Sequence, residues 1–90
     1  MKRPRLIFGP EPEYPLLAKH ARISGAVVID ALIDTQGNVV DMHPVSGHQL
    51  LIMAAMAALR QRKYEPTTLG GQAYPVRMLV TITFELKKDP

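Results

Sequence analysis

The side chains that could carry out chemistry in this sequence are its histidines and a serine close to one of them. None of His20, His43 and His48 lies in an H-x-x-x-H spacing beside a carboxylate, the pattern that supports metal binding on a helix. Ser46 precedes His48 closely, but no G-x-S-x-G elbow and no third, orienting group accompany it. The chain has no cysteine. We therefore expect no enzymatic activity, no metal site and no cofactor.

The composition indicates one small globular domain. The chain has 90 residues, of which 47% are hydrophobic and 21% charged, a balance typical of a folded chain. The net charge is +3, and Lys2, Arg3 and Arg5 supply three of the eleven basic residues, so the other eight match the eight acidic ones. A neutral body with a basic leader lacks the clustered positive charge of a nucleic-acid-binding domain. We therefore expect no nucleic-acid partner.

The amino-terminal segment reads as a linker. Residues 1–13 contain three prolines and a glycine and are predicted to form an extended tether that continues a longer linker upstream. The domain itself is predicted over residues 14–88. A helix is expected over Leu16–Arg22, with Pro15 at a first-turn position that tolerates proline and Gly25 marking the exit.

Two strands and a second helix follow. Residues 26–34 alternate so that Val27, Ile29, Ala31 and Ile33 share one face, which predicts a strand buried on one side. The turn over residues 34–38 contains Gly and Asn and leads into a second strand over residues 39–45. Residues 49–63 are rich in Ala, Leu and Met, end in basic residues, and predict a helix stopped by Glu65-Pro66.

The clearest alternation lies at the end of the chain. After a loop with Gly70-Gly71, a last strand over residues 76–87 is predicted to point Val76, Met78, Val80, Ile82, Phe84 and Leu86 inward. We expect methionines 42, 53, 56 and 78 to fill the core rather than line a binding groove. The cluster Arg60 to Lys63 is interpreted as a solvated helix end.

These elements define an α+β fold of order α-β-β-α-β. A right-handed crossover makes the second and third strands parallel, so the first strand can lie between them. The fold class is thus a three-stranded antiparallel sheet, in the order second-first-third, with two helices on one face. Pro44 removes a backbone donor from one outer strand, whereas the last strand has no proline after Pro75. The open edge is therefore predicted on the last strand.

Several ordered blocks of the sequence resemble the TonB C-terminal domain family from Tyr14 to Leu86. Each block is short, but together they keep the family's order and spacing. The blocks are Tyr14-Pro15, Arg22-Ile23-Ser24-Gly25-Ala26-Val27, Gly37-Asn38-Val39, Val45-Ser46-Gly47, Ala57-Ala58-Leu59-Arg60 with Tyr64-Glu65-Pro66, Gly71, and Val80-Thr81-Ile82-Thr83-Phe84.

The resemblance implies a periplasmic domain at the end of a proline-rich linker that is anchored in the inner membrane. Such a domain captures the TonB box, a short segment of a TonB-dependent outer-membrane transporter, as an added strand beside its last strand. It thereby couples the inner-membrane proton-motive force to uptake, with inner-membrane proton-channel proteins as further partners through the anchor.

The resemblance and the predicted edge together give the expected partner-binding residues, which are Glu11, Glu13, Tyr14, Pro15, Arg77, Leu79, Thr81, Thr83 and Glu85. The family often carries amide side chains where this chain has Glu11 and Glu13, and an aromatic residue where it has Arg62. Three alternatives stay open. They are a TonB-like interaction or sensor module of another envelope protein, a small nucleic-acid-binding domain, and a strand-exchanged homodimer formed through the open edge.

Overall fold

The computed structural model describes residues 3–87, so Met1 and Lys2 of the predicted tether and Lys88 of the predicted domain lie outside the described residues. The elements run in chain order as β1 (Leu6–Phe8), α1 (Leu16–His20), β2 (Gly25–Ile33), β3 (Val39–Ser46), α2 (Gln49–Arg60), β4 (Lys63–Tyr64), β5 (Thr67–Leu69), β6 (Gln72–Tyr74) and β7 (Val76–Phe84). Among these residues, no helix combines the length and the apolar character needed to cross a membrane.

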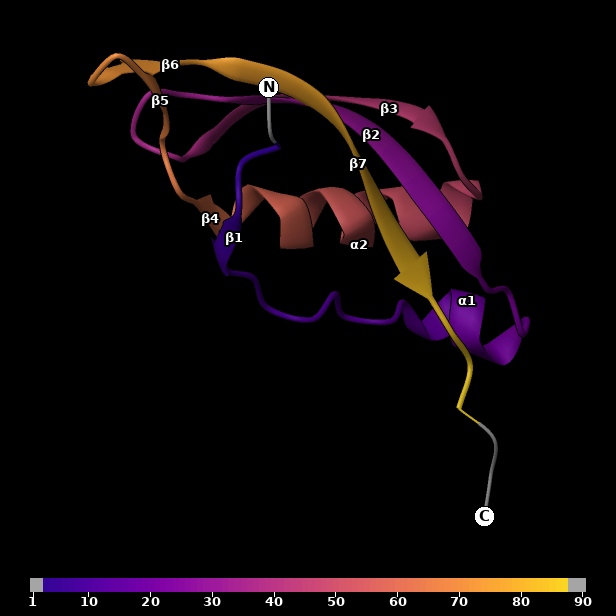
Figure 1. Cartoon of the computed structure of the whole chain (residues 1–90). Helices are drawn as coiled ribbons and strands as arrows, with labels where there is room; N and C mark the ends of the chain where they lie inside the picture. The colour runs from indigo at the N-terminus through magenta and orange to yellow at the C-terminus, as the bar shows by residue number, and fades with distance from the viewer. Residues whose placement is uncertain (1–2, 88–90) are drawn as a thin grey trace.

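The central sheet has three antiparallel strands in the order β3-β2-β7, which confirms the predicted fold class. β2 pairs with β7 without interruption from Gly25 opposite Phe84 to Ile33 opposite Val76. Both helices lie on one side of this sheet, with α2 beneath its centre and α1 near the end of β7 (Figure 1).

The hydrophobic core lies between the sheet and α2. The predicted phase of both long strands is confirmed, because the inward residues of β2 and the last three inward residues of β7 are buried, while Val76 and Met78 are half-buried. Three of the four methionines expected in the core pack against it at least partly, but Met53 is 77% exposed on α2. The buried set comprises Ala18, Val27, Ile29, Ala31, Ile33, Leu51, Ala55, Ala58, Leu59, Tyr64, Val80, Ile82 and Phe84.

Helix α1 ends earlier than predicted, and its terminator is an arginine rather than Gly25. Arg22 has a φ of 58°, the left-handed conformation that glycine usually supplies. The N–H of Ile23 donates to the carbonyl of Ala18 at 2.8 Å, and the N–H of Arg22 donates to that of Lys19 at 3.1 Å. These two bonds form a Schellman cap, so the helix stops at His20.

Helix α2 ends at Arg60, three residues before the predicted end. The chain turns at Gln61 so that Tyr64 can donate its N–H to the carbonyl of Gly37 at 2.9 Å. The Lys63 ammonium donates to the carbonyl of Gln36 and to the side chain of Asn38, at 2.6 and 3.0 Å. These contacts hold the end of the helix against the β2–β3 turn and withdraw Lys63 from it.

Two short pairings add to the predicted elements. β5 and β6 form a hairpin around Gly70-Gly71, in place of the predicted loop. β1, within the segment predicted to be an extended tether, pairs with β4 through Leu6 opposite Tyr64 and Phe8 opposite Lys63. The last strand ends at Phe84 instead of Lys87, because its neighbour β2 begins at Gly25, opposite Phe84.

Candidate functional site

The outer edge of β7 is one of the two free edges of the central sheet. β7 pairs with β2 on one side, and within residues 3–87 no strand pairs with its other side. The Arg3 guanidinium donates to the carbonyl of Leu79 at 2.7 Å, so this carbonyl faces away from β2. Since backbone groups in an antiparallel ladder alternate between the two edges, those of Arg77, Thr81 and Thr83 face the same way as those of Leu79.

The opposite edge of the sheet, on β3, is less suited to receive a strand. Pro44 lies within β3 and has no backbone N–H. The pairing of β3 with β2 also shifts register twice, near Val28 and near Leu32, and such irregularities disturb a regular ladder. The two edges of the sheet therefore differ as the prolines in the sequence indicate.

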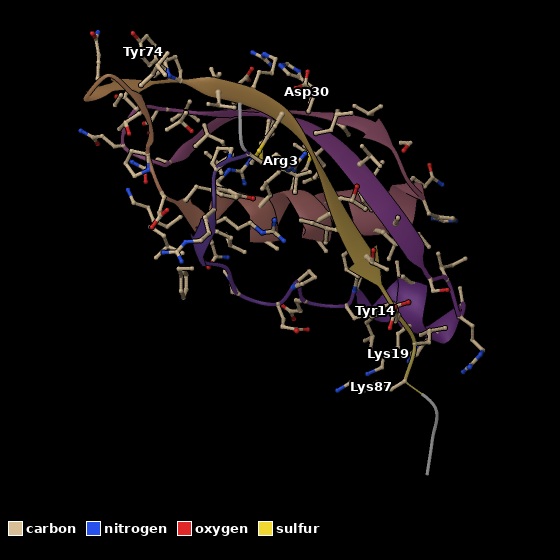
Figure 2. All side chains as sticks on the ribbon, viewed as in Figure 1. Arg3, Tyr14, Lys19, Asp30, Tyr74 and Lys87 are labelled. Carbon is tan, nitrogen blue, oxygen red and sulfur yellow. The ribbon has the colours of Figure 1, made fainter. Side chains whose placement is uncertain are left out.

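A groove continues the open edge beyond the end of β7. It has a volume of 710 Å³ and lies between the segment leading into α1 and residues 83–87. Predicted site residues Glu11, Tyr14, Thr83 and Glu85 line it. Lys19 of α1 and Lys87 line it as well, and their side chains lie near Tyr14 in Figure 2.

Tyr14 contacts the elements on both sides of this groove. Its ring meets that of Phe84 edge to face, with centroids 5.4 Å apart and an interplanar angle of 84°, a favoured geometry for aromatic pairs. Its hydroxyl donates to the carbonyl of Ile23. Tyr14 is half-buried and therefore connects the segment before α1 to the end of β7 and to the segment between α1 and β2.

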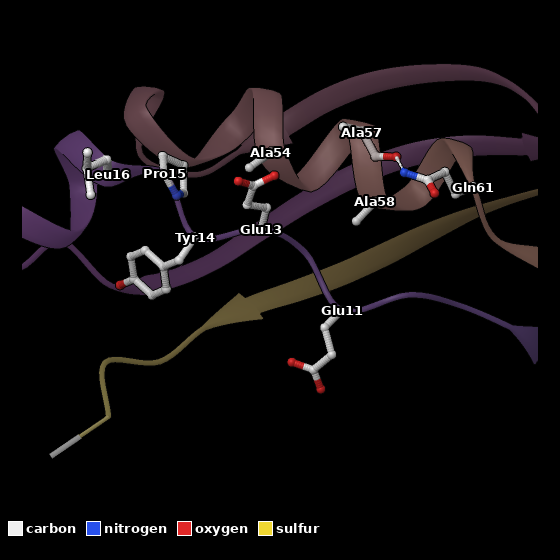
Figure 3. A pocket seen from close by; sticks show the side chains of 9 residues that line it. All are labelled: Glu11, Glu13, Tyr14, Pro15, Leu16, Ala54, Ala57, Ala58 and Gln61. Atoms are coloured by element: carbon white, nitrogen blue, oxygen red, sulfur yellow. Dashed lines mark hydrogen bonds between the residues drawn. The ribbon is translucent and has the colours of Figure 1, made fainter. Parts of the chain in front are cut away.

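A second hollow lies on the other side of the same segment. It has a volume of 580 Å³ and separates residues 11–16 from the carboxyl-terminal half of α2. The predicted site residues that line it are Glu11, Glu13, Tyr14 and Pro15, together with Ala54 and Ala57 of α2. Figure 3 shows the Glu13 side chain directed toward α2 and the Glu11 side chain directed away from it. Glu13 therefore lines only this hollow, whereas Glu11 lines both the hollow and the groove at the end of β7.

Arg77 lies apart from these grooves, on the outer face of the sheet. Its guanidinium is 3.4 Å from the carboxylate of Asp30 and 3.5 Å from that of Asp41. Asp41 also lies 2.9 Å from the His43 ring, and the hydrogen bonds from His43 and Arg77 hold the pKa of Asp41 below its usual value. Arg77 therefore links β7 to β2 and β3, and only its backbone belongs to the edge.

The structure thus brings four predicted residues to the groove at the end of β7 and four to the hollow beside α2, and Glu11 and Tyr14 belong to both sets. Leu79 and Thr81 lie on the open edge between this groove and Arg77. Sequence reasoning missed Arg3, Lys19 and Lys87 as neighbours of the edge. No spacing in the sequence could have found Arg3, because it contacts a residue 76 positions away.

The fold and the site define a small α+β interaction domain with one open sheet edge. The family described as the C-terminal domain of the Gram-negative bacterial TonB protein matches residues 10–86. The chain belongs to this family of TonB C-terminal domains. Its members are non-enzymatic modules, so this chain is not an enzyme.

Individual relatives agree with this assignment. Protein TonB of Vibrio cholerae is 32% identical over 79 residues, which are 86% of this chain and 32% of that protein. Protein TonB of Xanthomonas campestris is 35% identical over 77 residues, which are 83% of this chain and 34% of that protein. The chain spans about a third of the length of these relatives.

The solution structure of the Pseudomonas aeruginosa TonB C-terminal domain has the same fold. Its TM-score to this chain is 0.75 at 21% sequence identity, and the alignment covers 96% of this chain and 89% of that domain.

Proposed function

We propose that this domain binds an extended segment of a TonB-dependent outer-membrane transporter, the TonB box, as an added strand beside β7. The observation that carries the proposal is the unpaired edge of β7 together with the groove that continues it. In strand addition the backbone bonds supply affinity, and pockets for alternate side chains supply specificity. Thr81, Thr83 and Glu85 would form the edge, with Glu11 and Tyr14 on the facing wall, while Glu13 and Pro15 would border the hollow beside α2.

The proposal extends to the protein that carries this domain. We infer that the domain works in the periplasm, tethered through a linker to an inner-membrane anchor. Through that anchor, inner-membrane proton-channel proteins would couple the proton-motive force to uptake by the bound transporter. Family membership and the TonB relatives support this inference.

A second candidate is a TonB-like interaction or sensor module of another envelope protein. The observation that favours it is the presence of Glu11 and Glu13 beside the groove and the hollow, where the family often has amides. An upstream sequence with a single membrane anchor and a proline-rich spacer would favour the transducer.

A strand-exchanged homodimer would use the same β7 edge. Mass measurements by sedimentation equilibrium or light scattering would detect it.

The first prediction tests strand addition with peptides from the amino-terminal segments of the outer-membrane transporters encoded in the same genome. We expect at least one peptide to shift the backbone amide resonances of Thr81 and Thr83 and to leave those of β3 unchanged. Thr81→Pro removes an edge-facing N–H and should abolish this binding while the domain stays folded. Thr81→Val is the matched control, since it keeps the N–H and should bind like the wild type.

Two outcomes would contradict the proposal. One is a folded Thr81→Pro variant, checked by circular dichroism and thermal melting, that binds the peptide as the wild type does. The other is a response confined to Val39–Ser46. Val80→Pro is unsuitable as the main test. Val80 is 3% exposed, and its backbone N–H and C=O point toward β2. Proline at this position would therefore disrupt the core and the β2–β7 ladder.

A further inference from the structure

The segment that precedes the matched family region is attached to the body of the domain. The carbonyl of Arg5 accepts from the N–H of Glu65 at 2.8 Å, and the Arg5 guanidinium lies 2.6 Å from the Glu65 carboxylate. β1 then pairs with β4. Gly9 passes so close to Arg62 that an added Cβ would lie 3.3 Å from its Cγ. Residues 5–9 are therefore held at several successive points.

This attachment brings Arg3 to the open edge. From Arg5 the chain runs up from β1 toward β7 (Figure 1), and Figure 2 shows the Arg3 side chain beneath the strand. The guanidinium donates to the carbonyl of Leu79 at 2.7 Å. A hydrogen bond from a charged donor is stronger than one between neutral groups, and arginine keeps its charge at every physiological pH.

The bonded carbonyl is one that an added strand would need. The edge-facing backbone groups of β7 belong to Arg77, Leu79, Thr81 and Thr83, as the alternation of the ladder requires. A strand that paired along the whole edge would have to displace Arg3 from Leu79. A strand that paired only from Thr81 onward would leave Arg3 in place and would lead directly into the groove at residues 83–87.

We propose that Arg3 sets the register of the incoming strand by closing the edge at Leu79. The inference rests on the proposed function and deepens it, because it names the part of the edge that the partner uses. The paired stretch then runs from Thr81 to Glu85, about five residues, so the partner is a short extended segment rather than a long strand. Arg3 acts as a positioning residue that limits where pairing begins.

The Arg3 contact can be measured before any peptide is added. Arg3→Ala should change the carbonyl ¹³C shift of Leu79 and the amide ¹⁵N shift of Val80, because both report on the hydrogen bond at that carbonyl. Arg5→Ala is the matched control, since it removes an arginine and an exposed ion pair but keeps the backbone bond from Glu65 to Arg5 and the β1–β4 pairing that hold the segment in place. Equal chemical-shift changes in the two variants, or no change in either variant, would overturn the proposed contact.

The register is tested with two synthetic peptides, of about five and about nine residues, cut from the transporter segment that binds in the mapping experiment. With the wild type, the longer peptide should protect the amides of Thr81 and Thr83 from hydrogen exchange and leave that of Arg77 unprotected. With Arg3→Ala, protection should extend to Arg77. The affinity of the longer peptide relative to the shorter should rise roughly three- to tenfold, the worth of one net hydrogen bond.

The outcomes separate this inference from the proposed function. If the longer peptide protects Thr81 and Arg77 equally in the wild type and in Arg3→Ala, strand addition stands and the register role of Arg3 is wrong. If no peptide protects any β7 amide in either protein, the proposed function fails and the register role falls with it. Arg5→Ala should behave as the wild type with both peptides.

Discussion

Phe84→Ala is the sharpest test of how the end of β7 is built. Phe84 is 2% exposed, and its ring packs edge to face on Tyr14. Emptying a buried phenylalanine site destabilises a domain by about 3–5 kcal/mol, and the aromatic pair accounts for roughly 0.5–1.5 kcal/mol of this loss. A domain of this length has a total stability on the order of 5–13 kcal/mol, so the substitution should remove a large share of it.

The measurement is urea unfolding followed by circular dichroism and by tyrosine fluorescence. Phe84→Leu is the matched control, because it keeps most of the buried volume and should lose less than about 1.5 kcal/mol. A cycle with Tyr14→Ala isolates the pair, for which a coupling of about 0.5–1.5 kcal/mol is expected. A loss below about 1 kcal/mol for Phe84→Ala would refute the strand phase, and zero coupling would refute the role given to Tyr14.

Two further predictions concern the cap of α1 and the β2–β3 turn. Arg22→Gly should stabilise the domain by roughly 0.5–1 kcal/mol, because glycine adopts the positive φ of this position without strain although it loses more entropy on folding; an unchanged or lowered melting temperature would contradict this. The carboxylate of Asp34 accepts hydrogen bonds from the N–H groups of Asn38 and Gln36, chiefly the former, and its pKa lies below the ordinary 3.8. Because the folded pKa is the lower one, its stabilisation is complete above the unfolded pKa and is lost as the pH falls through the folded pKa. When the pH is lowered from about 6 to about 2.5, the free energy of unfolding should therefore fall less in Asp34→Asn than in the wild type, as measured by urea midpoints. An equal fall in both proteins would count against the turn contacts.

Alternating patterns in the sequence predicted the central sheet well, because burial on one face imposes a period of two residues on each strand. Alternate residues from Val27 to Ile33 and from Val80 to Phe84 lie in the core, as this period requires. The order of the strands followed from the handedness of the crossover, and the open edge from the position of Pro44.

The helix ends and the short strand pairings could not be predicted from alternating patterns in the sequence. The end of α2 depends on the fit of Tyr64 against the β2–β3 turn, a contact between segments distant in the sequence. Arg22 in a left-handed conformation could not be foreseen, because the usual signal for that position is glycine. The contact of Arg3 with Leu79 likewise arises from the path of β1 across the body of the domain. Residue types and spacing along the chain therefore predicted the β7 edge of the candidate site but not the neighbouring residues that surround it.

The uninterrupted ladder between β2 and β7 also has a mechanical consequence. All nine residues of β7 face a partner in β2, and the ion pairs of Arg77 reach across to β3. A pull directed along β7 loads these bonds in parallel, so that they share the force and must break together. A pull directed outward from the edge would open them one after another at much lower force. The domain is therefore most resistant to tension along the direction in which β7 runs, which is also the direction of any strand laid beside it.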